Sequence, residues 1–123
     1  MATVHFSDRE LSCFCCGQAG LTLDFLNALE ELRRKFGKPM PVTSGYRCES
    51  YDAQVGGAGP HTIGAVDVAM HGPRAHELIG AAMELGWTGI GVKQHGQYRR
   101  RFLHFDRLAG DDSHPRPRVW TYA

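Results

Sequence analysis

The chain of 123 residues lacks any apolar run long enough to cross a lipid bilayer, which takes about 20 consecutive residues. It also lacks an excess of charge of one sign, because its net charge at pH 7 is +1. A run of three arginines at 99–101 stands alone, and we interpret it as a solvated loop or a substrate-facing patch rather than a nucleic-acid arm. We therefore expect neither membrane insertion nor nucleic-acid binding.

The N-terminus lacks the basic and then apolar pattern of a secretory leader, so we expect synthesis in the cytoplasm without a signal peptide. Internal repeats, low-complexity stretches and interdomain linkers are also lacking, and the length is sufficient for one hydrophobic core. We predict a monomer with a single domain over residues 1–123. Within it, a cysteine-containing segment spans 1–20 and a proline-rich tail spans 110–123.

Cysteines are few, and their spacing lacks the paired Cys-x-x-Cys units of a zinc ribbon. The four are Cys13, Cys15, Cys16 and Cys48. The residues alone leave open one or two disulfides, a metal cluster, or neither. In the absence of an export signal, reduced thiols packed against one another are the favoured interpretation, and a zinc site formed by them is less favoured.

Two segments have the apolar spacing of amphipathic helices. The first spans residues 22–36, with Thr22 suited to cap its start and Gly37 to end it. The second begins at Pro73, carries its apolar residues inward and stops at Gly86. Both are interpreted as core helices.

Short strands are predicted around these helices. They lie at 42–43, 65–70, 88–92 and 101–106, with a helical turn at 49–54 and a loop at 93–100. The tail from Pro115 to Ala123 has too many prolines for a helix, so we expect it to lie over the surface, anchored by Trp120 and Tyr122. Helices packed on one small antiparallel sheet give an α+β fold.

Two histidines and an aspartate have a spacing that suits a metal ion. On the strand at 65–70, Asp67 points to the face opposite the valines beside it, and the same alternation orients His104 on the strand at 101–106. If His61 lies in the loop before the first strand, all three side chains meet at one point. Two imidazoles and one carboxylate suffice for a catalytic zinc with an open fourth position. Histidine-rich segments and buried strand carboxylates also occur without metals.

Several segments occur in an order that resembles a known family. They are residues 41–48, 55–58, 61–67, 89–92 and 102–106. In this order they resemble the D-alanyl-D-alanine carboxypeptidase and phage endolysin family of zinc peptidases, which is related to the Hedgehog signalling domain. The resemblance runs from about Phe6 to Asp106 and rests on the co-occurrence of the segments, which is more specific than any one of them.

The resemblance implies a hydrolase that binds Zn²⁺ through His61, Asp67 and His104. It implies cleavage of peptidoglycan stem peptides, as a carboxypeptidase or as an endopeptidase. By the same resemblance Arg47, with Tyr46 beside it at the rim, holds a carboxylate or carbonyl of the substrate, because a guanidinium matches a carboxylate bidentately. Without a leader, such an enzyme is expected to reach the cell wall through a holin pore or as part of a virion.

Relatives in this family also have a cysteine near position 13 and another after the Ser-Gly-Tyr-Arg turn. By this resemblance, Cys48 is the residue expected to lie near the N-terminal cysteines. Their role is expected to be structural.

The chain departs from the family pattern at several positions. One residue fewer separates His61 from Asp67, and Gly59 replaces a common serine. Relatives place an acid or a histidine two or three residues before the last zinc ligand, where this chain has Phe102 and Arg101. Neither of these residues is a base.

The general base therefore has two other candidates. Asp106 lies on the same strand face as His104, and either takes the proton or orients that histidine. His95 lies in the loop at 93–100. The shortened spacing and the missing base favour an alternative function, a catalytically inactive binding module on the same fold. A structural virion component is a third possibility.

Overall fold

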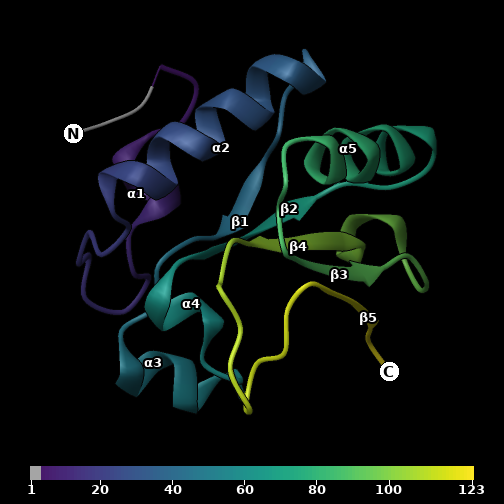
Figure 1. Ribbon diagram of the computed structural model, residues 1–123. Coiled ribbons are helices and arrows are strands. Elements are labelled where there is room, and N and C mark those ends of the chain that lie inside the picture. Colours follow the sequence, from purple (N-terminus) through teal and green to yellow (C-terminus); the bar gives the residue numbers. More distant parts are fainter. Residues whose placement is uncertain (1–3) are drawn as a thin grey trace.

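The computed structural model describes residues 4–123, so the first three residues of the predicted segment 1–20 lie outside the described part (Figure 1). The helices are α1 (Asp8–Leu11), α2 (Leu23–Phe36), α3 (Glu49–Gln54), α4 (Pro60–Ile63), α5 (Pro73–Glu84) and the 3₁₀ helix η1 (Tyr98–Arg100). The strands are β1 (Val42–Ser44), β2 (Ala65–Ala69), β3 (Gly89–Lys93), β4 (Phe102–Asp106) and β5 (Arg118–Thr121). The predicted α+β class is confirmed.

The strands of residues 4–123 form one sheet in the order β1-β2-β4-β3-β5. The first four of these strands pair with one another in antiparallel orientation, as predicted. In the ladder between β2 and β4, Asp67 lies directly opposite His104, and Ala65 lies opposite Asp106. The two strands that carry candidate metal ligands are therefore hydrogen-bonded neighbours inside the sheet.

Helices α2 and α5 lie together on one face of the sheet (Figure 1). Their apolar side chains pack on the inner residues of the central strands, which are Val66, Val68, Ile90, Leu103 and Phe105. Because side chains alternate along a strand, Asp67 and His104 project from the opposite face. Helix α4 and the segment 107–117 lie on that side of the sheet (Figure 1).

Local signals in the sequence account for the helix ends. Thr22 accepts a hydrogen bond from the backbone N–H of Phe25 at 3.1 Å, and Gly37 ends α2 in the left-handed conformation with φ of 75°. Pro73 occupies the first turn of α5, as predicted. No helix among residues 4–123 is long and apolar enough to span a membrane.

The tail differs from the expectation that it would only lie over the surface. Residues 118–121 form β5, which pairs with β3 in parallel orientation and makes the sheet mixed rather than wholly antiparallel. Gly91 lies opposite Trp120, and a Cβ atom there would approach the Tyr122 hydroxyl to 2.6 Å. The bare backbone of β3 therefore gives the tail side chains room over the sheet.

Candidate metal centre

Three candidate ligands converge between β2, β4 and α4. Oδ1 of Asp67 lies 3.2 Å from Nε2 of His61 and 3.2 Å from Nδ1 of His104. All three ligand atoms lie within 4.8 Å of one another. His61 belongs to the one-turn helix α4 rather than to the loop expected for it, because Pro60 begins a helical turn there. Asp67 nevertheless has the predicted register and faces both imidazoles.

The outward nitrogen of each imidazole is bonded to an acceptor. Nδ1 of His61 donates to the carbonyl oxygen of Gly45 at 2.8 Å, and Nε2 of His104 donates to Oδ2 of Asp106 at 2.8 Å. A neutral imidazole carries one proton, so the inward nitrogens retain their lone pairs for an ion. Acceptors of this kind fix the tautomer and orientation of zinc-binding histidines. The donor set therefore fits zinc.

At the candidate metal centre, buried carboxylates lie next to imidazoles, and each group shifts the pKa of the other. Burial would raise the pKa of Asp67, but the neighbouring imidazoles of His104 and His61 outweigh it and hold the pKa well below its usual range. Burial would lower the pKa of His104, but hydrogen bonds to Asp106 and Asp67 outweigh it and raise the pKa. The two carboxylates beside His104 therefore favour its protonated form when no metal is bound.

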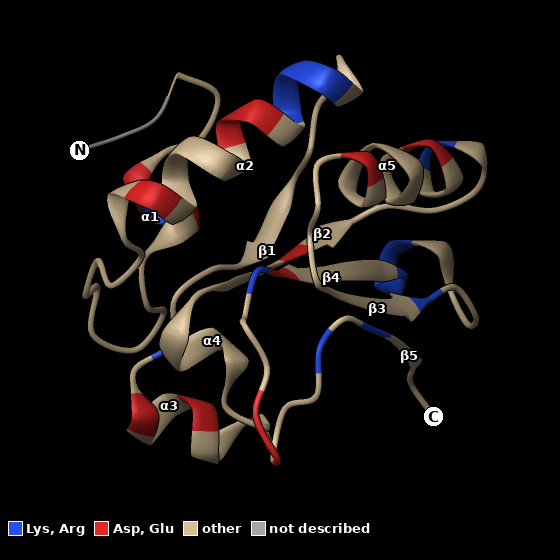
Figure 2. Ribbon diagram, in the orientation of Figure 1, with Lys and Arg blue, Asp and Glu red and all other residues tan. Residues whose placement is uncertain are grey.

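Asp106 is fully buried and is held by a residue that the sequence interpretation missed. Arg116 donates from Nε to Oδ1 at 2.9 Å and from Nη2 to Oδ2 at 2.8 Å, while its guanidinium lies over the Trp120 ring. Figure 2 shows basic positions (blue) along the tail that leads to β5. A buried carboxylate needs a cation as its partner. This requirement, together with the basic residues of the tail, could have indicated Arg116 from the sequence.

A cavity of about 540 Å³ opens over the candidate ligands. Its wall combines the glycine-rich loop 55–58 with the tail, and it includes Arg47, His61, Asp67, His104, Trp120 and Tyr122. The Trp120 ring packs on His104 with ring centroids 5.0 Å apart. An extended chain segment that enters this cavity therefore meets both the imidazoles and an aromatic wall.

Arg47 lies at the site, as predicted. Its Nη2 is 3.5 Å from Oδ2 of Asp67, its Nη1 donates to Asp52 at 3.1 Å, and its Nε donates to the Ser44 hydroxyl at 3.1 Å. Three anchors hold the guanidinium in one orientation beside the candidate ligands. Asp52, which is buried in α3, was not predicted to have this role.

Tyr46 does not line the cavity that contains the two histidines. Its ring packs against Gly20, and it borders a neighbouring hollow of about 640 Å³. That hollow shares Arg47, Asp67 and Phe102 with the first one. The two depressions therefore meet at Arg47 and Asp67.

Two further histidines lie near the tail. His95 is exposed, and its Nε2 is 3.2 Å from the carbonyl oxygen of Tyr122, so the side chain borders the tail rather than the cavity. His114 is partly buried in the cavity wall. Its Nε2 lies 2.7 Å from the carbonyl oxygen of Ala58. This contact joins the tail to the glycine-rich loop.

The sequence model of the family described as Peptidase M15 matches residues 4–106. We found no match among curated proteins or among solved structures. The matched region contains His61, Asp67, His104 and Arg47, whereas Arg116 and the aromatic residues of the tail lie beyond it. Because the match spans most of the chain, and includes a donor set that fits a metallopeptidase, the chain belongs to the peptidase M15 family.

Proposed function

We propose that the chain is a zinc-dependent peptidase that cleaves peptidoglycan stem peptides and holds its zinc with His61, Asp67 and His104. The observation that carries the proposal is the orientation of the two imidazoles. Both have an outward nitrogen bonded to an acceptor, and both turn the other nitrogen toward one carboxylate oxygen. Membership of the family supports the same chemistry.

When bound, zinc supplies a Lewis acid that polarises a scissile carbonyl and lowers the pKa of water. The residues of the chain prepare its ligands. Gly45 fixes the tautomer of His61 through its carbonyl, and Asp106 fixes that of His104. Arg116 neutralises the charge of Asp106, so that this carboxylate remains ionised in a fully buried position.

We propose that Asp106 orients His104 and does not transfer the proton. Its two oxygens accept hydrogen bonds from His104, from both ends of the Arg116 fork and from the backbone N–H of Leu108. An acceptor with so many donors has a pKa well below its usual range and a weak tendency to take a proton. His95 is then the remaining candidate base, and it has to turn from the Tyr122 carbonyl toward the cavity.

Substrate anchoring is assigned to Arg47 in this proposal. Stem peptides carry carboxylates at D-Glu and at the terminal D-Ala, and an arginine fork binds such groups bidentately. Arg47 lies where the two depressions meet, so a peptide lying across them passes both the guanidinium and the candidate ligands. Tyr46 borders the second depression and is proposed to contact the peptide there.

The test is digestion of purified peptidoglycan with the zinc-loaded protein, with new termini read by mass spectrometry. New amino or carboxyl termini within the stem peptide are expected, and their position distinguishes a carboxypeptidase from an endopeptidase. His104→Ala should abolish both cleavage and zinc binding at this centre, because two ligands rarely hold a catalytic zinc. His76→Ala, on the exposed face of α5, is the matched control.

A binding module is the second candidate function, and the observation that favours it is the absence of a base at positions 101 and 102. Under that function the protein binds zinc and wall fragments without releasing new termini. Zinc binding with no cleavage of any wall preparation would therefore contradict the peptidase and support the module.

A further inference from the structure

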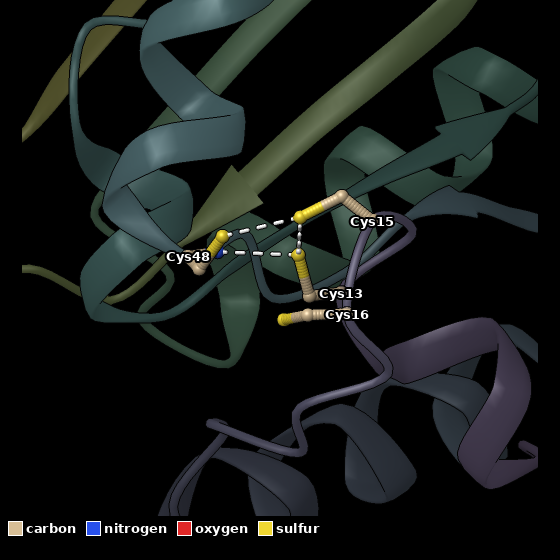
Figure 3. A group of neighbouring side chains, drawn as sticks. All are labelled: Cys13, Cys15, Cys16 and Cys48. Carbon is tan, nitrogen blue, oxygen red and sulfur yellow. Dashed lines mark hydrogen bonds between the residues drawn. The ribbon is translucent and has the colours of Figure 1, made fainter.

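A second group of metal-binding side chains lies away from the candidate metal centre. Cys13, Cys15 and Cys16 come from the segment between α1 and α2, and Cys48 is the residue before α3. Figure 3 shows the four sulfur atoms turned toward a common space between these segments. Their Sγ atoms all lie within 4.8 Å of one another. The expectation that Cys48 lies near the N-terminal cysteines is confirmed.

The separations between these sulfurs match the edges of a zinc tetrahedron. With Zn–S bonds of about 2.3 Å, tetrahedral geometry places neighbouring sulfurs about 3.8 Å apart. The Sγ atoms of Cys13 and Cys15 are 3.6 Å apart, and those of Cys15 and Cys48 are 3.4 Å apart. All four cysteines are free. An ion of zinc's size therefore fits among the sulfurs with small adjustments of their side chains.

The environment of Cys13 favours the thiolate, which is the form that binds metal. The backbone N–H of Cys48 donates to Sγ of Cys13 at 3.4 Å. Cys13 is buried, so this hydrogen bond is shielded from water.

We propose that Cys13, Cys15, Cys16 and Cys48 bind a second zinc ion in a closed, structural four-thiolate site. A zinc site formed by the cysteines was the less favoured interpretation of the sequence, because their spacing lacks paired Cys-x-x-Cys units. The fold favours it, because the chain brings Cys48, 33 residues beyond Cys15, to the other three cysteines. Soft thiolate ligands in tetrahedral arrangement select zinc among common divalent ions.

The site would join the N-terminal segment to the turn that serves the metal centre. That turn already bonds to the segment, because the backbone N–H of Tyr46 donates to the carbonyl oxygen of Leu11 at 2.9 Å. Cys48 directly follows Arg47, and Gly45 in the same turn accepts the hydrogen bond of His61. Zinc at the cysteines would therefore hold in place the backbone that orients one ligand and the substrate-anchoring arginine.

The first test measures metal content in protein purified under reducing conditions. About two zinc ions per chain are expected in the wild type and about one in His104→Ala, which keeps the cysteines. Cys48→Ser should lose the cysteine-bound ion, whereas Ser50→Ala, an exposed change in the first turn of α3, should retain it. Purified His104→Ala protein that contains no zinc would overturn the proposal.

The second measurement remains decisive if Cys48→Ser does not fold. Cobalt-loaded His104→Ala should show thiolate-to-cobalt charge-transfer absorption, which a His₂Asp centre cannot give. A mercurial reagent should then displace about one zinc per chain from the zinc form. Four freely reactive thiols, two disulfides or bound iron would overturn the proposal. None of these measurements depends on cleavage of the cell wall. The proposal for the cysteine site can therefore be tested separately from the proposed peptidase function.

Discussion

Asp106 shows how one buried acid depends on its neighbours. Gly89 provides the space for it, because a Cβ atom at that position would overlap the carboxylate. Its charge is balanced by Arg116, and its hydrogen bond directs His104 toward Asp67. Asp106 therefore acts on the candidate metal centre through the imidazole of His104 and does not line the cavity.

Replacing Asp106 distinguishes an orienting role from proton transfer. We expect Asp106→Asn to weaken zinc binding at the His104 centre by about 10–100-fold, because the imidazole loses its charged acceptor. Competition with a chromophoric chelator measures this affinity, and Asp112→Asn, an exposed change in the tail, is the control. Unchanged zinc affinity with a rate loss of about 10²–10⁴-fold would instead identify Asp106 as the general base.

Arg47 is expected to act on substrate rather than on metal. Arg47→Ala should leave zinc content unchanged and raise KM, because the guanidinium lies outside the ligand set and offers a fork for a carboxylate. Arg47→Lys should recover only part of the loss, since an ammonium lacks the planar pair of donors. Steady-state kinetics on a stem peptide measure both effects. Loss of zinc from Arg47→Ala would show that its contact with Asp67 supports the metal instead.

At the scale of elements, strand β3 depends on the two glycines of its cavity face, Gly89 and Gly91. On its cavity face Gly91 lies under two tail residues, and a Cβ atom there would come within 2.7 Å of Trp120 Nε1 as well as meeting the Tyr122 hydroxyl. Both rings pack on β4, with Trp120 against His104 and Tyr122 against Phe102. A side chain at position 91 would therefore displace the wall of the cavity.

Gly91→Ala is expected to destabilise the fold by about 1–3 kcal/mol through overpacking. Gly80→Ala is the matched control, because a Cβ atom in that exposed part of α5 meets no atom within 4 Å; alanine there should stabilise by about 0.4–1 kcal/mol. Urea unfolding gives both values, and near-ultraviolet circular dichroism reports the environment of Trp120. Equal stability of the two variants would show that the tail accommodates the methyl group.

Much of this architecture follows from short-range patterns. Apolar periodicity and capping residues predicted α2 and α5, and strand alternation predicted that Asp67 and His104 share a face. Strand β5 was not predicted, because its pairing with β3 is non-local and parallel, and the nearby prolines are typical of irregular structure. Arg116 and Asp52 were missed for a related reason, since their partners are chosen by tertiary contact rather than by spacing.

At the scale of the whole molecule, two groups at the centre make stability depend on pH in opposite directions. Burial would raise the pKa of Asp106, but hydrogen bonds from His104 and Arg116 outweigh it and hold the pKa well below its usual range. Its contribution is present above about pH 3.9, the pKa of an unfolded aspartate, and is lost as the pH falls through the folded value. His104 has a raised pKa, so its contribution is present below about pH 6.5 and is lost as the pH rises through the folded value.

The zinc-free protein is therefore expected to be most stable between about pH 4 and pH 6.5 and to lose stability on either side. Urea unfolding in the presence of a chelator, repeated across this range, measures the free energy of unfolding. Asp106→Asn should flatten the acid side because one shifted carboxyl is removed. Stability that keeps rising from pH 6 to pH 8 without zinc would contradict the charge arrangement described for His104.

The division of the cavity between scaffold and tail has an evolutionary consequence. The family match ends at residue 106, whereas the aromatic wall comes from β5 and Tyr122. Mutations in the tail are therefore expected to reshape the pocket without altering a candidate metal ligand, provided that Arg116 is retained to hold Asp106. Descendants of such a gene can vary the aromatic wall while they inherit the same candidate ligands, and protein engineers can exchange tails to the same end.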